Sequence, residues 1–186
     1  MRTLGVSLAI ALIAAAVVMA GKPAESPAGS SAERTALPQA PNAQADASMM
    51  NTFSSAADVQ ALLAKAKAEH KEGQVMVSEH ILSLAPYVAN LEYRPIDGAV
   101  AVHEKEAEMV YVIDGGGTLI TGGTVVGEKR TNAANLSGTA IDGGTMRTIA
   151  KGDFAIIPEG TPHQFKPAGG ALVLMTLHVP RPVGAQ

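Results

Sequence analysis

Beyond Gly73 the chain consists of short runs rich in Val, Ile, Leu and Tyr, separated by glycine and proline turns. Runs of this length suit β-strands, and turns of this kind suit connections between neighbouring strands. No long helical pattern interrupts the runs, which argues against a parallel α/β sheet. The sequence therefore predicts an all-β sandwich or barrel. The predicted strands are residues 75–84, 87–94, 99–103, 108–113, 118–121, 146–149, 154–157 and 171–179.

Three segments precede the predicted barrel. Residues 1–20 begin with a positive charge, continue as an apolar run and end in small residues, which is typical of a secretory signal peptide. The alternative is an uncleaved membrane anchor, but the apolar run is shorter than the roughly 20 residues of a comfortable span. Residues 21–52, rich in Ala, Pro and Ser, are expected to form a disordered linker. Residues 53–73 are expected to form a helix that has a capping box at Ser55 and ends at Gly73.

Charge and composition exclude some classes of partner. A net charge of -3 over 186 residues gives no basic surface for nucleic acid. An aromatic content of 3% without tryptophan argues against stacking platforms for bases or sugars. After cleavage of the signal peptide we expect a periplasmic or secreted protein with no stable membrane association. The sequence leaves both a monomer and a homodimer open.

Two imidazoles and one carboxylate stand where they could meet inside such a barrel. His103 and Glu108 flank a predicted solvated turn, and His163 follows a Pro/Gly turn. Because the chain has no cysteine, His, Glu and Asp are the available metal ligands. Two imidazoles and a carboxylate form the ligand set of the facial triad, which leaves positions open for substrate. Glu108 also stands in an otherwise apolar run, where an unpaired carboxylate would be costly, and this favours a ligand role.

Both stretches resemble motifs of the cupin superfamily. The segment from Gly152 to His163, read as Gly-x5-Pro-x-Gly-x2-His, resembles the second cupin motif up to its last element, where Pro167 stands in place of Asn. The segment that begins at His103, read as His-x4-Glu-x6-Gly, resembles the second half of the first motif. The earlier histidine of that motif would fall at Ala101, so one of the family's ligands is missing here.

The resemblance covers about residues 74–182 and implies a cupin-type β-barrel or jelly roll with one N-terminal helix before it. It also implies one divalent metal ion per chain, held by His103, Glu108 and His163 near one mouth of the barrel. Neutral imidazole and carboxylate suit Fe, Zn, Mn, Ni or Cu, and the ligand types do not choose among these ions. Because alternate side chains of a strand share a face, Ala101 and His103 are both expected to point into the barrel.

Further polar residues on predicted strands are candidates for the same site. His80 and His178 could each replace the missing imidazole, and the alternative for each is an ordinary core or surface histidine. Glu92, Tyr93 and Arg94 form a polar and aromatic cluster on one strand. We expect one or two of these three side chains to point inward and contact substrate.

Three classes of function stay open at this point. The first is a metal-dependent enzyme that acts on a small metabolite, of oxygenase, isomerase or lyase type, for which no catalytic residue is assigned. The second is a non-catalytic module that binds a metal or a small ligand. The third is a structural domain with a relict site. The resemblance to cupins is compatible with all three classes, because a fold alone does not determine function.

Overall fold

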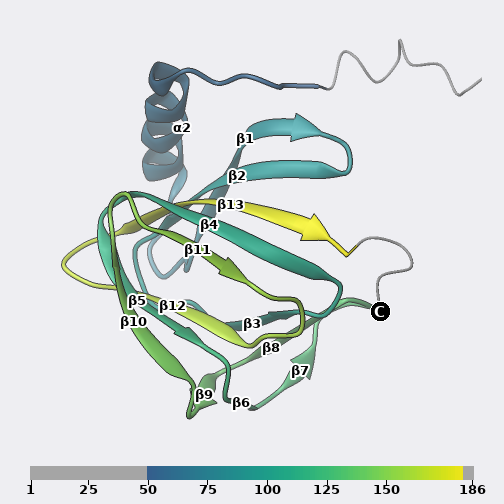
Figure 1. Cartoon of the computed structure of the whole chain (residues 1–186). Helices are drawn as coiled ribbons and strands as arrows, with labels where there is room; N and C mark the ends of the chain where they lie inside the picture. The colour runs from purple at the N-terminus through teal and green to yellow at the C-terminus, as the bar shows by residue number, and fades with distance from the viewer. Residues whose placement is uncertain (1–49, 182–186) are drawn as a thin grey trace, which may run out of the picture. The chain divides into compact units, whose positions relative to one another are not determined.

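In the computed structural model, the described residues are 50–181, and they form two antiparallel sheets with one helix beside them (Figure 1). The first sheet contains, in spatial order, β1 (Val77–Leu84), β2 (Tyr87–Arg94), β13 (Leu172–Pro180), β4 (Glu106–Asp114) and β11 (Phe154–Ile157). The second contains β10 (Thr145–Ala150), β5 (Gly116–Thr121), β12 (His163–Pro167), β3 (Val100–His103), β8 (Asn135–Gly138) and β7 (Lys129–Arg130). A small third sheet joins β6 (Thr124–Val126) to β9 (Ala140–Asp142).

The two large sheets face each other, and strand alternation decides which side chains lie between them. In β4, Glu108, Val110 and Val112 are buried, whereas the intervening Met109 and Tyr111 are partly exposed. This is the period of two that a half-buried strand requires. The core between the sheets consists of Val110, Val112, Leu119, Ile149, Ile157, Phe165, Leu172 and Leu174. The all-β barrel predicted from the short apolar runs is thus confirmed.

The single described helix, α2 (Ala56–Glu69), packs against β1 and β2. Leu63 and Ala66 are its buried residues, and they contact apolar side chains on the outer face of the first sheet. The predicted capping box is present, since the Ser55 side chain accepts a hydrogen bond from the backbone of Asp58 and the Asp58 carboxylate accepts one in return. The helix supplies a second, smaller core and leaves the barrel interior untouched.

Both ends of this N-terminal region differ from the sequence-based expectation. The helix ends at Glu69, because the backbone of His70 is already extended, and Gly73 lies in the turn that follows, with φ of 76°. Asn51, expected to belong to the disordered linker, instead forms a β-bridge with Ser83 through two backbone hydrogen bonds. The predicted signal peptide and residues 21–49 of the predicted linker lie outside the described residues.

No strand was predicted within residues 124–142, but the structure has four there. These residues form β6, β7, β8 and β9, which are short and mostly exposed. β8 and β7 lie at one edge of the second sheet, and β6 and β9 form the small third sheet. These strands bury little surface, so their sequence shows no clear alternation. One of them, β8, pairs with β3 over its full length and so lies directly beside His103.

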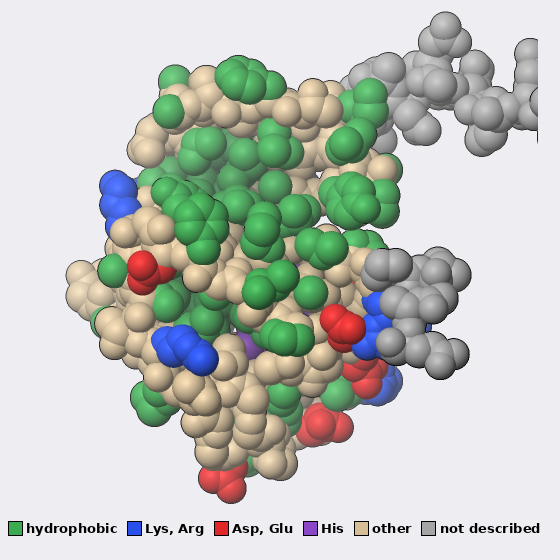
Figure 2. Space-filling model, viewed as in Figure 1, with side chains coloured by type: hydrophobic (Ala, Val, Ile, Leu, Met, Phe, Trp, Pro, Cys, Tyr) green, Lys and Arg blue, Asp and Glu red, His purple; other side chains and the backbone are tan. Residues whose placement is uncertain are grey.

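An apolar surface remains on the outer face of the first sheet, where α2 does not reach. Phe154 and Ile156 of β11 are 72% and 68% exposed, and the Phe154 ring lies 4.5 Å from that of Tyr111. Figure 2 shows apolar side chains gathered on this side of the molecule. Within residues 50–181, no helix is long and apolar enough to cross a membrane.

Candidate metal centre

Three side chains from three different strands meet between the sheets. His103 ends β3 and His163 begins β12, both in the second sheet, and Glu108 lies on β4 of the first sheet. One ligand atom from each residue lies within 4.8 Å of the other two. Glu108 and His163 are each 3% exposed, and the His103 side chain is 17% exposed. The three residues predicted from spacing and resemblance are therefore brought together at one point.

Local backbone contacts hold the two histidine segments against each other. Pro158 and Gly160 form a turn before β12, and Gly160 has φ of 70°, a conformation that glycine adopts without strain. The backbone N–H of Gly160 donates to the carbonyl oxygen of His103 at 2.8 Å. His163 pairs with Ala101 in the register of β12 and β3. The turn of the second motif is thus bonded directly to the strand of the first.

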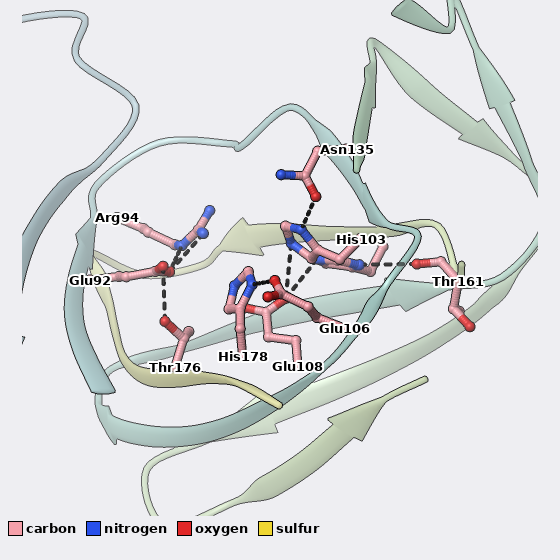
Figure 3. Close-up of polar contacts among 10 residues, drawn as sticks. Glu92, Arg94, His103, Glu106, Glu108, Asn135, Thr161, Thr176 and His178 are labelled. Carbon is pink, nitrogen blue, oxygen red and sulfur yellow. Dashed lines mark hydrogen bonds and ion pairs between the residues drawn. The ribbon is translucent and has the colours of Figure 1, made fainter. Parts of the chain in front are cut away.

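Each imidazole is oriented by a partner at its Nδ1 atom. Nδ1 of His103 lies 2.9 Å from Oδ1 of Asn135, and Nδ1 of His163 lies 3.1 Å from the carbonyl oxygen of Thr161 (Figure 3). A carbonyl oxygen only accepts hydrogen bonds, so Nδ1 must donate in both rings. In the neutral form of each ring, Nε2 then carries a free lone pair. Metal-ligating histidines have this arrangement, in which the second nitrogen donates to a fixed acceptor.

The two Nε2 atoms converge on a single carboxylate oxygen. Oε2 of Glu108 lies 2.8 Å from Nε2 of His163 and 3.6 Å from Nε2 of His103. This oxygen is buried, yet it accepts no hydrogen bond of acceptable geometry within the described residues. Lone pairs of two nitrogens and one oxygen that face each other repel unless a cation lies among them. The donor set and the orphaned oxygen therefore fit a divalent ion.

The neighbouring groups also shift the ionisation of these residues. Burial lowers the pKa of His103, and the hydrogen bond with Asn135 opposes this shift only in part. Burial would raise the pKa of Glu108, but the contact with His163 and the charge that His163, His103 and His178 carry when protonated outweigh it, so its pKa is lowered. Both shifts favour the deprotonated forms, a neutral imidazole and a carboxylate, which are the forms that bind metal.

The remaining histidine candidates occupy different places. His178 lies on β13 directly opposite Glu108, and its ring centroid is 4.3 Å from that of His103. Its Nδ1 atom bonds Oε2 of Glu106 at 3.0 Å. The ligand atoms that lie within 4.8 Å of one another come from His103, Glu108 and His163, so His178 lies beside this triad and is not part of it. His80 is exposed on β1, which β2 and β13 separate from β4. The expectation that His80 could be a fourth ligand is wrong, because it required a sheet order that the chain does not have.

The proposed substrate contacts on β2 divide between the two faces of the sheet. Glu92 and Arg94 point into the barrel, where Glu92 accepts a hydrogen bond from Thr176 at 3.0 Å. Tyr93 packs on the opposite face with the second core beneath α2, and its ring lies 5.7 Å from that of His70. The candidate role for Tyr93 is wrong for this reason, since the strand alternates and the helix covers its outer face.

Sequence reasoning missed three groups that orient the imidazoles. Asn135 lies on β8, Thr161 contributes a backbone oxygen, and Glu106 was taken as part of a solvated turn although it begins β4. No periodic signal marks Asn135, because its role depends on the pairing of β8 with β3, where it lies opposite His103.

The two stretches that resemble cupin motifs converge inside an antiparallel barrel built from two sheets, and Ala101, where one ligand of the motif is missing, pairs with His163. The fold is a cupin-type β-barrel. Its motif residues come from both sheets, so the site depends on the closed barrel.

Several solved structures resemble this chain. The cupin domain of Cnp3 from Schizosaccharomyces pombe is 15% identical to it, with a TM-score of 0.43 and coverage of 62% of this chain and 72% of that one. KdgF from Halomonas sp. is 15% identical, with a TM-score of 0.44 and coverage of 60% and 86%. The protein TT1209 from Thermus thermophilus is 18% identical, with a TM-score of 0.44 and coverage of 64% and 95%. These similarities carry no functional conclusion. No family model and no curated protein matches the chain.

Asn135 provides a test of how the His103 ring is oriented. Replacing Asn135 with leucine removes the acceptor for Nδ1, and we expect metal affinity to fall by roughly 10- to 100-fold, as is usual for such outer partners. Asn135→Asp keeps an acceptor at the same position and should retain the wild-type affinity. Titration of both variants with Zn²⁺ checks this, and equal affinities in the two variants would show that Asn135 does not orient the ligand.

Proposed function

We propose that this chain is an exported cupin that holds one divalent ion between His103, Glu108 and His163 and acts as an enzyme on a small metabolite. The observation that carries the proposal is the convergence of two Nε2 lone pairs on a buried carboxylate oxygen that accepts no hydrogen bond in the described part of the chain. Such a group is costly in a barrel interior unless a cation compensates it. The bound ion would be Fe, Zn, Mn, Ni or Cu.

Three protein ligands distinguish a catalytic metal site from a closed structural one, because a position stays open for water or substrate. Ala101 favours such an opening, since its small side chain stands beside His163 where the family motif has a further imidazole. When bound, an ion of this kind polarises a carbonyl oxygen or activates a water molecule. An oxygenase, isomerase or lyase reaction would use this chemistry.

The chain's own residues supply position and shielding. Asn135 and the carbonyl of Thr161 fix the two imidazoles, so little reorganisation is needed when the ion binds. The apolar core next to Glu108 keeps water from one side of the site. His178, oriented by Glu106, presents a further imidazole beside the triad that could hydrogen-bond to a bound substrate. A polar group of this kind favours an enzyme over a purely structural domain.

Turnover by the metal-loaded protein tests the enzymatic part of the proposal. We expect conversion of at least one member of a panel of small hydroxy acids, oxo acids and sugar acids, and loss of that conversion after chelation of the metal. If ligands of the panel bind without any conversion under all five metals, the chain is a non-catalytic binding module, and the enzymatic assignment is wrong.

Export is a separate part of the proposal and has its own test. The mature chain should begin near Gly21, because the small residues before it are suited to signal peptidase. Intact mass and N-terminal sequencing of protein from the periplasm or the medium check this. Recovery of the full-length chain from the membrane fraction would instead identify residues 1–20 as an anchor.

A further inference from the structure

The guanidinium of Arg94 is held in one orientation inside the barrel. Its Nε and Nη2 atoms both bond Oε2 of Glu92, at 2.8 and 2.7 Å, and the other Glu92 oxygen accepts from Thr176. One face of the group lies over the Phe165 ring, with 5.0 Å from Cζ to the ring centroid. Gly98 provides the space, since a Cβ there would lie 3.1 Å from Nη1. This arrangement fixes a planar group that is otherwise flexible.

The fixed guanidinium retains donors that the described residues do not use. A guanidinium has five N–H donors. In Arg94, Nε donates a hydrogen bond to Oε2 of Glu92, and Nη2 forms an ion pair with the same oxygen. Nη1 makes no hydrogen bond within residues 50–181. The side chain is 15% exposed, so the group is largely buried without being sealed from small solutes. An oriented N–H edge of this kind matches the geometry of a carboxylate.

The arginine and the metal centre face the same interior. The Phe165 ring is near both, because the Arg94 guanidinium lies over it and the His163 ring centroid is 6.0 Å from its own. His163 and Phe165 are alternate residues of β12 and so share one face of the strand. Figure 3 shows Arg94 and Glu92 on one side of this interior, with His178 between them and the Glu108 group.

We propose that Arg94 binds the carboxylate of the substrate, and that the substrate class of this site is small organic acids with a second oxygen donor directed toward the triad. The second contact, between the substrate oxygen and the triad, rests on the proposed function. The contact with Arg94 is inferred from the geometry of the arginine alone. Glu92 acts as a positioning residue that holds the guanidinium and reduces its charge, and Thr176 holds Glu92 in turn.

A structural ion pair and a substrate-binding arginine respond differently to two conservative substitutions. Arg94→Lys keeps a positive charge beside Glu92 but loses the planar donor edge, so carboxylate affinity should fall by roughly tenfold or more. Glu92→Gln leaves a single acceptor oxygen for two donors, Thr176 and Arg94, so the guanidinium is no longer held and carboxylate affinity should fall several-fold. A purely structural ion pair would leave carboxylate affinity unchanged in both variants.

The experiment is a calorimetric titration of the full chain with malonate, and with the uncharged malonamide of the same shape. NMR additionally follows the Arg94 Nε–Hε resonance in every protein that keeps Arg94. The titration is done on zinc-loaded and on metal-free protein, and Arg147→Lys serves as the control because Arg147 is an exposed arginine that bonds Thr121. We expect malonate to shift the wild-type resonance, malonamide to have no effect, and the control variant to bind as wild type. Zinc content is measured on every variant.

The outcomes separate this inference from the proposed function. Equal malonate affinity in wild type and Arg94→Lys, with one zinc ion bound to each, would overturn the role of Arg94 and leave the metal site intact. If the wild type binds no zinc, but still binds malonate more tightly than Arg94→Lys does, the proposed function is overturned and the carboxylate site stands. If malonamide binds as tightly as malonate, the inference is also contradicted, because binding then does not depend on the negative charge of the ligand.

Discussion

Replacing His163 with alanine is expected to reduce metal content from one divalent ion per chain to none, while the barrel stays folded. The His163 ring is 3% exposed and places Nε2 2.8 Å from Oε2 of Glu108, so the variant loses one of only three ligands. Metal analysis after desalting measures the loss, and far-UV circular dichroism checks the fold.

His80→Ala is the matched control for this variant. It also removes one imidazole, but from an exposed position on β1, and it should keep one ion per chain. Retention of stoichiometric metal by His163→Ala, or an equal loss in His80→Ala, would be incompatible with the triad.

Glu108→Gln is expected to remove the stabilisation that metal gives to the fold. A ligand that binds only the folded state at a thousand times its dissociation constant adds about 4 kcal/mol to the free energy of unfolding. We expect a gain of this size for the wild type with zinc and almost none for the variant. Without metal, the variant should be at least as stable as the wild type, because a neutral amide costs less to bury than a carboxylate and can donate to an Nε2 lone pair.

Urea unfolding of both proteins, with and without zinc, measures these free energies. The metal-free comparison is the more informative one. A loss of several kcal/mol in metal-free Glu108→Gln would mean that the carboxylate is already paired within the protein, and the orphaned oxygen would no longer be an argument for a metal. An undiminished gain from zinc in the variant would contradict a ligand role for Glu108.

The barrel and its triad could be predicted because their signals are local. Alternation along β4 marks Glu108, Val110 and Val112 as one face, and the structure buries all three. The turn at Pro158 and Gly160 has its own sequence signature, which places His163 at the start of a strand. Ligands that stand next to such signals are accessible to reasoning from a sequence.

The groups around the triad could not be predicted, because they depend on which strands become neighbours. His80 on β1 and His178 on β13 both lie in apolar runs of the sequence. Of these two strands, β13 pairs with β4 and β1 does not, so His178 lies next to the site and His80 does not. Asn135 comes from a polar segment without periodicity and acts only through its pairing opposite His103. Strand alternation separates Tyr93 from Glu92 and Arg94, but no local pattern reveals that α2 covers the face on which Tyr93 lies.

The most direct test of the central claim is the metal content of the wild-type chain, measured after purification from its native compartment and again after incubation with Fe(II), Zn, Mn, Ni and Cu in turn. We expect one tightly held divalent ion per chain with at least one of these metals. A wild-type protein that stays folded and metal-free under all five conditions would contradict it.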